Sequence, residues 1–229
     1  MVRAMAGRDS RLAGIAQYER GDAAEVVFEI GWPEVERDIA WAARLIETAG
    51  LVAGDHVLVT ARNCEGPWLS PLVQVLRARE IVYSNGEPYG WDARRSATFL
   101  SLLPIKAIIA MSGETAEALT ADEQTVARLA ELSLIWARPE AVPILRNAGL
   151  EPALLAMLGP ALAAECPARN GLHLDPEQWA VQRESGGLTL TTVGDRIHRA
   201  HGAPLGVDGE VDPTPCICGL PGPRVRLTV

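Results

Sequence analysis

Three cysteines and a histidine near the C-terminus carry the strongest chemical signal in the sequence. Cys166 and His173 lie seven residues apart in ECPARNGLH, and one residue separates Cys216 from Cys218 in PCICG. Thiolates and imidazole are the ligands of tetrahedral zinc, and a flanking proline and glycine favour the tight turn that two such close thiols need. The set predicts a structural zinc site, because four protein ligands leave no position open for a substrate. The alternative is three unrelated thiols and a surface histidine.

Other residue types capable of chemistry are isolated in the sequence. Cys64 follows an apolar segment, where parallel sheets place ligand loops, and is either a reactive thiol or a small buried residue. His198 and His201 have no carboxylate or nucleophile held beside them by spacing. Lys106 is the only lysine among 21 basic residues, and it precedes an apolar segment, so we expect its ammonium to extend to solvent. The sequence therefore names no catalytic residue.

Composition narrows the class of protein. The chain has 229 residues, 48% of them hydrophobic and 22% charged, which suits a folded core. Its net charge is −8 and the basic residues are scattered, so we expect neither a nucleic acid nor a membrane as partner. The N-terminus is interrupted by charges and unlike a secretory signal. These features predict a cytoplasmic protein with reduced thiols, which favours metal binding over disulfides.

Hydrophobic periodicity predicts alternating helices and strands, and these elements must position the candidate residues. Strands are predicted where short β-branched or apolar runs occur, at His56–Thr60, Ile81–Ser84, Ile105–Met111, Leu134–Trp136, Trp179–Gln182, Leu188–Thr192 and Val225–Val229. Helices are predicted at about residues 33–50, 69–77, 92–103, 115–131 and 139–148. This order predicts an α/β fold, with a mostly parallel sheet flanked by helices in residues 1–149. Residues 150–229 are rich in proline and glycine, and we expect a small zinc-stapled, β-rich lobe there.

Several stretches resemble a known enzyme family. The segments GPALAAECPARNGLHLDPEQWAV, GGLTLTT and CICG are similar to phenylacetate–coenzyme A ligase-like members of the adenylate-forming superfamily, as is GWPEVERDIAWAARLIETAGLVAGDHVLV. The resemblance spans about residues 25–220 and is specific only near 159–173 and 187–219. It implies that Cys166, His173, Cys216 and Cys218 match the structural zinc site found in part of that family.

Departures from the family pattern bear on function. The stretch that resembles the family's ATP-phosphate loop, YERGDAAEVVFEIGW, contains no serine, threonine or lysine and adds carboxylates, which repel polyphosphate. Ala156 stands where the family has a magnesium-binding glutamate, and alanine cannot hold a metal ion. Asp195 is either a remnant of the family's ribose-binding aspartate or a solvated turn residue. The family's mobile C-terminal domain, which carries a catalytic lysine, is expected to be absent.

The resemblance and its departures leave two functional classes. The first is a non-catalytic relative, a pseudoenzyme of acyl-CoA or aryl-CoA ligases that binds an acyl ligand or acts as an accessory protein. The second is an enzyme, either a divergent acyl-activating ligase completed by a partner chain or a fold reused for acyl transfer without ATP. The first is favoured, since stabilising charged phosphates needs the missing groups. We expect structural zinc and no binding of ATP or magnesium. We also expect a homodimer that binds an acyl or aryl acid or a CoA-type ligand, and a second protein is a further candidate partner.

Overall fold

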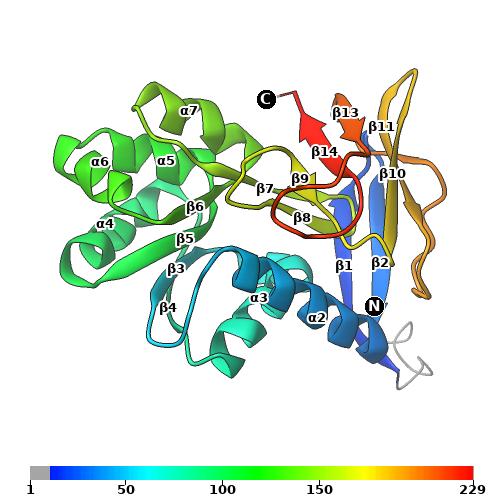
Figure 1. The fold of residues 1–229 in the computed structure, drawn as a ribbon, viewed down its shortest axis with the longest axis horizontal. Helices are drawn as coiled ribbons and strands as arrows, with labels where there is room; N and C mark the ends of the chain where they lie inside the picture. Colours follow the sequence, from blue (N-terminus) through cyan, green and yellow to red (C-terminus); the bar gives the residue numbers. More distant parts are fainter. Residues whose placement is uncertain (1–10, 229) are drawn as a thin grey trace.

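The chain folds around a mixed nine-stranded sheet flanked by helices (Figure 1). The computed structural model describes residues 11–228. The order across the sheet is β13-β14-β9-β8-β7-β6-β5-β3-β4. Its strands are β3 (His56–Thr60), β4 (Val82–Gly86), β5 (Ile105–Met111), β6 (Leu134–Ala137), β7 (Ala153–Leu158), β8 (Ala161–Glu165), β9 (Leu172–His173), β13 (Gly209–Asp212) and β14 (Arg224–Leu227).

The sheet changes character at β7. From β4 through β3, β5 and β6 to β7 every neighbouring pair is parallel, as the alternating helices and strands predicted. From β7 through β8, β9 and β14 to β13 every pair is antiparallel. The expected sheet is therefore right in class but parallel only in part. Because β6 pairs with β7 across residue 150, the two expected parts of the chain share one sheet.

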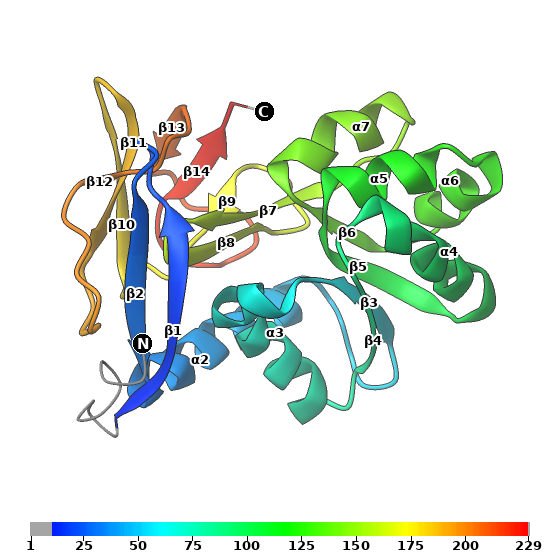
Figure 2. The same ribbon diagram turned by 180° about the vertical axis from the view of Figure 1, so that it is seen from behind.

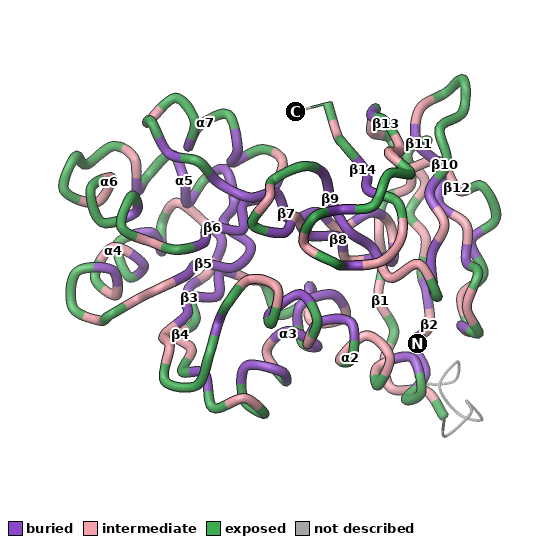
Figure 3. The backbone as a smooth tube through the Cα atoms, viewed as in Figure 1, coloured by how far each residue is buried: buried purple, intermediate pink, exposed green. Residues whose placement is uncertain are grey.

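Helices cover both faces of the parallel half (Figures 1 and 2). They are α2 (Trp32–Thr48), α3 (Gly66–Ala78), α4 (Ala93–Leu102), α5 (Gly113–Thr120), α6 (Glu123–Ala130) and α7 (Val142–Asn147), with short 3₁₀ turns η1 (Asn63–Glu65), η2 (Gly90–Asp92) and η3 (Pro139–Ala141). Val57 and Val59 of β3 pack with α2 and α3, whereas Leu58 packs with the helices of the opposite face. Strands buried on both faces explain the continuous apolar runs in the sequence, and Figure 3 shows the central strands β5, β6 and β7 as mostly buried.

The single helix expected over about residues 115–131 is wrong. The chain forms α5 and α6 there, separated at Ala121 and Asp122. The Asp122 carboxylate accepts a hydrogen bond from the Thr125 amide at 2.9 Å and so starts a new helix. An aspartate at this position caps a helix more favourably than it continues one.

Two smaller sheets complete the fold. The strands β1 (Leu12–Glu19) and β2 (Glu25–Gly31) form an antiparallel hairpin, which the sequence did not predict. The strands β10 (Trp179–Glu184), β11 (Gly187–Thr192) and β12 (Ala203–Pro204) form the other sheet, and two of these were expected. Among residues 11–228, no helix is long and apolar enough to cross a membrane.

Candidate metal centre and ligand cleft

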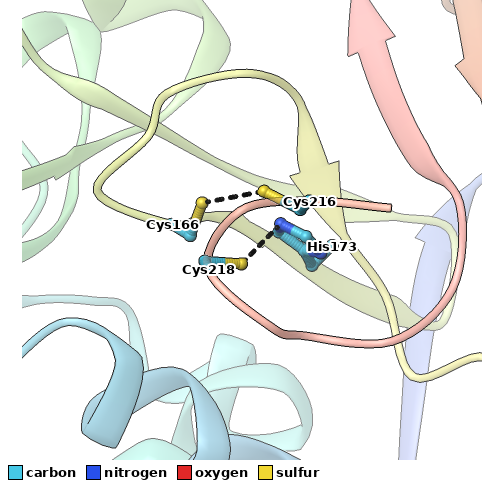
Figure 4. A group of neighbouring side chains, drawn as sticks. All are labelled: Cys166, His173, Cys216 and Cys218. Carbon is cyan, nitrogen blue, oxygen red and sulfur yellow. Dashed lines mark hydrogen bonds between the residues drawn. The ribbon is translucent and has the colours of Figure 1, made fainter. Parts of the chain in front are cut away.

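The four predicted metal ligands come together in the antiparallel half of the sheet (Figure 4). Cys166 directly follows β8, and His173 lies in β9. Cys216 and Cys218 lie in the proline-rich loop 213–223 between β13 and β14, which passes over β8 and β9. The four ligand atoms all lie within 4.8 Å of one another. The fold therefore brings together two sequence motifs that lie 50 residues apart in the chain.

The distances within this cluster fit a tetrahedral metal ion. The sulfur atoms of Cys166 and Cys216 are 3.7 Å apart, and the Cys218 sulfur lies 3.5 Å from Nε2 of His173. Bonds of about 2.3 Å to sulfur and about 2.0 Å to nitrogen place tetrahedral ligands about 3.8 Å (sulfur–sulfur) and about 3.5 Å (sulfur–nitrogen) apart. A disulfide needs sulfurs about 2.05 Å apart, so the pair Cys166 and Cys216 is unbonded. The donor set and its spacing can hold a metal.

Burial controls the protonation of the ligands. Burial raises the pKa of the Cys166 thiol to about 12. It acts in the same direction on Cys216, but the Cys218 amide and the neighbouring thiols outweigh it and lower the pKa of that thiol below its ordinary value. Burial and the charge of Arg224 lower the pKa of His173, which keeps its imidazole neutral. Neutral imidazole is the form that binds a metal, so the histidine is prepared for coordination.

A cleft of about 670 Å³ lies between strand β1 and the start of helix α3. Its lining mixes apolar and polar side chains and comes from β1, β2, η1, α3, the β7–β8 turn and Leu205. Trp68 fixes one wall, because its indole nitrogen donates to the Gly159 carbonyl at 2.9 Å and its ring packs against Phe28. Arg62 and the exposed Cys64 supply polar groups. The cleft can accommodate a small organic ligand with an apolar part.

The tip of the β1–β2 hairpin, residues 20–24, is closed by its own contacts. The amides of Arg20 and Ala23 donate within the tip, and the Gly21 amide donates to the Pro204 carbonyl at 2.9 Å. A methyl group built on Gly21 would lie 2.2 Å from the backbone nitrogen of Gly206, so the two loops touch through glycine alone. The tip therefore offers few free amides and little space.

An ion pair that the sequence analysis missed lies at the carboxyl ends of the parallel strands, beside the cleft. Glu65 and Arg138 are both buried, and two hydrogen bonds of 2.6 and 2.8 Å join them. Arg138 also donates to the carbonyls of Thr60 and Ala110. Ala110 has φ +66°, a left-handed conformation unusual for alanine, where the β5–β6 register shifts. The only local signal in the sequence is an arginine directly after an apolar strand.

The remaining candidate residues are dispersed. Asp195 does not line the 670 Å³ cleft; its carboxylate is 95% exposed and pairs with Arg199 at 3.1 Å. The Lys106 ammonium does not extend freely to solvent but pairs with Asp55 at 2.9 Å. His198 packs behind the cleft wall, with Nε2 3.4 Å from the Tyr18 hydroxyl. The ribose-site hypothesis for Asp195 stays a prediction.

Comparison with known proteins identifies the fold. No family model and no curated protein matches the sequence. A 2-hydroxyisobutyryl-CoA ligase bound to 2-HIB-AMP and CoA is similar with a TM-score of 0.69 and 15% identity, over 96% of this chain and 57% of that one. A malonyl-CoA ligase bound to methylmalonyl-CoA and AMP is similar with a TM-score of 0.61 and 13% identity, over 97% and 54%. The N-terminal subdomain of Klebsiella oxytoca NpsA is similar with a TM-score of 0.54 and 13% identity, over 94% and 59%.

These likenesses define the class of fold. The chain has the fold found in these two acyl-CoA ligases, and it spans little more than half the length of those structures. The broader resemblance drawn from the sequence is thus confirmed for the fold. None of the three proteins is a phenylacetate–CoA ligase, so that narrower resemblance stays a prediction. At such low identity the likeness concerns architecture, and chemistry must be argued from this chain's own residues.

Proposed function

We propose that this protein is a non-catalytic relative of the acyl-CoA ligases, which binds an acyl or aryl acid or its CoA thioester in the 670 Å³ cleft. One observation carries the proposal: the hairpin tip that follows the cleft-lining Glu19 is closed by its own contacts, while the cleft itself is open. The tip belongs to the stretch that resembles the family's phosphate loop. A ligand site without a phosphate site suits binding better than adenylation.

The contacts of the hairpin tip argue against a bound triphosphate. Phosphates bind to free backbone amides and cations. The amides of the tip instead donate hydrogen bonds to carbonyls within the tip, to the Pro204 carbonyl and to the Asp22 carboxylate. Asp22 also neutralises Arg20, the cation of the tip, at 2.6 Å. Ala156, which stands at the magnesium-ligand position of the resemblance, is buried within β7. These features support the absence of ATP and magnesium binding.

The composition of the cleft supports an acyl or aryl ligand. Ile15, Val27 and Met157 provide apolar contacts, and the half-exposed Arg62 supplies a cation for a carboxylate or for a phosphate of a CoA thioester. Arg62 is partly neutralised by Glu65, so we expect modest affinity for a free acid.

We also propose that a zinc ion binds at the Cys₃His cluster and has a structural role. The donor set and the tetrahedral distances support zinc, which would supply a cross-link that holds loop 213–223 against β8 and β9. Four protein ligands leave no position open, so we assign the centre no catalytic role. Elemental analysis of the purified protein should find close to one zinc per chain, and a fully folded protein without metal would contradict this part.

Two measurements test the proposed binding function. Pyrophosphate exchange with a panel of aryl and short acyl acids should be undetectable, and calorimetry should show no binding of ATP with magnesium. Calorimetry with the same acids and their CoA thioesters should show binding that weakens in Arg62→Gln. The matched control is Arg79→Gln, since Arg79 is also a half-exposed, ion-paired arginine but lies at the far end of α3, outside the cleft lining.

The outcomes separate the two functional classes. Exchange by the isolated chain would refute the non-catalytic function, and exchange only with a second protein would favour the divergent, partner-completed enzyme. Binding of no acid or thioester, or equal loss in both arginine variants, would refute the assignment of the cleft.

A further inference from the structure

We propose that Arg224 is the positioning residue that balances the charge of the Cys₃His metal centre and thereby sets its metal affinity. This inference rests on the proposed zinc site, and it concerns a residue that the sequence analysis did not single out. Three observations carry it: the register that places Arg224 beside His173, the charge of the loaded centre, and two buried nitrogen atoms without partners.

Strand register places Arg224 against the metal ligands. Arg224 begins β14 and lies directly opposite His173 of β9. Side chains of directly opposed residues in antiparallel strands project from the same face of the sheet. Arg224 is only 3% exposed, and its guanidinium donates to the Asn170 carbonyl at 2.9 Å and to Asp212 at 2.6 Å. A fixed cation is therefore held in the interior beside the cluster.

The charge of a loaded centre explains why a cation belongs there. A divalent ion with three thiolates and a neutral histidine carries one net negative charge, and burying a net charge is costly unless an opposite charge is near. Asp212 does not cancel Arg224 by itself, because it is shared with Arg226 at 2.6 Å. The two arginines and one aspartate together keep one positive charge in excess. That excess matches the negative charge of the loaded centre.

Two buried nitrogen atoms beside the cluster lack hydrogen-bond partners among the described residues. They are Nδ1 of His173 and Nε of Arg224. Histidine ligands usually donate their second ring N–H to a carboxylate or carbonyl, which orients the ring. His173 has no such hydrogen bond among the described residues, so we infer that the positive charge of Arg224 stabilises the centre instead. An anionic centre would also offset the cost of the unpaired guanidinium N–H.

The test compares zinc affinity in the full-length protein and its variants by competition with a chromophoric chelator. Cobalt(II) absorption reports in parallel whether thiolates still bind the metal. Arg224→Gln should weaken zinc binding by roughly 10–100-fold, the usual effect of losing support around metal ligands. Arg224→Lys keeps the charge but loses the forked hydrogen bonds, and it should restore most of that loss. Arg183→Gln is the matched control, because Arg183 is a half-exposed arginine that pairs with Asp208 and not with Asp212.

A second background separates charge from structure. Cys218→His removes one thiolate and makes the loaded centre neutral, so adding Arg224→Gln there should change zinc affinity only within about twofold. An equal loss in both backgrounds would show that Arg224 merely holds the loop, and would overturn the inference. If Arg224→Gln does not fold, the zinc affinity of Arg224→Lys tests the inference. An affinity near that of the wild type supports stabilisation of the centre by the positive charge, and a loss of tenfold or more refutes it. Wild-type protein that binds no zinc would overturn the metal assignment itself, whereas tight binding unaffected by Arg224 would overturn only this inference.

Discussion

Replacing Glu65 by glutamine tests the buried ion pair that closes the carboxyl end of the parallel sheet. Glu65→Gln keeps the shape of the side chain and an oxygen for the Arg62 amide, which donates to Glu65 at 2.8 Å. It removes the negative charge that faces Arg138, whose side chain is 9% exposed. The change therefore leaves a guanidinium buried without a counter-charge.

The structure sets the size of the effect. Removing one partner of a buried ion pair costs about 3–5 kcal/mol, because the remaining charge stays desolvated. Arg138 keeps its bonds to the Thr60 and Ala110 carbonyls, so we expect the lower end, about 3 kcal/mol. For a chain of this size, that corresponds to a fall in melting temperature of roughly 6–12 °C. The coupling between Glu65→Gln and Arg138→Met should be about 2–3 kcal/mol in a double-mutant cycle.

The pH dependence gives the prediction a second readout. Burial acts to raise the pKa of Glu65, but the hydrogen bonds from Arg138 and the Arg62 amide outweigh it and hold that pKa below its ordinary value. A carboxylate with a lowered pKa stabilises the fold above its ordinary pKa of about 4.3, and that stability is lost as the pH falls through the folded-state value. The difference in unfolding free energy between wild type and Glu65→Gln should be constant near neutral pH and shrink below about pH 4.3.

Urea denaturation followed by circular dichroism, at pH 7 and across the acid range, measures both quantities. Glu131→Gln is the control, because Glu131 pairs with Arg128 on the exposed surface and should change stability by no more than about 0.5 kcal/mol. A loss below about 1 kcal/mol in Glu65→Gln, or a difference from wild type that does not change with acid, would refute the reasoning.

Three further predictions concern the hairpin, the metal loop and assembly. Gly206→Ala should destabilise the hairpin tip, because Gly206 has φ +70° and a new methyl group would lie 2.8 Å from Gly21. Amide hydrogen exchange should become faster in β1 and β2 alone. Unchanged exchange would argue against the close packing of the two glycines. Cys216→Ser should lose zinc and unfold loop 213–223 at lower denaturant concentration, which limited proteolysis detects; a protected loop would speak against a metal cross-link. The homodimer expected from the sequence would be contradicted by light scattering that returned the monomer mass of 24.5 kDa at micromolar concentration.

Local patterns in the sequence determined the alternation of helices and strands from α2 to β6, apart from the break between α5 and α6. The apolar stripe after Trp32 predicted helix α2, and the run His56–Thr60 predicted strand β3 with its bounds, because helical spacing and short β-branched runs report burial directly. Residue type and turn chemistry selected Cys166, His173, Cys216 and Cys218 as a set, since few pairs of motifs supply tetrahedral ligands.

Only the tertiary structure decided the rest. Strands β7 and β8 are rich in alanine and have neither alternation nor β-branched residues, so nothing local marked them as the continuation of the sheet. The β1–β2 hairpin buries one face against residues as distant in sequence as His198, and its closed tip exists because Gly21 meets Gly206. Arg224 stands beside His173 only through strand pairing. Such contacts join segments far apart in the chain, and local periodicity carries no information about which distant segment a strand or loop will meet.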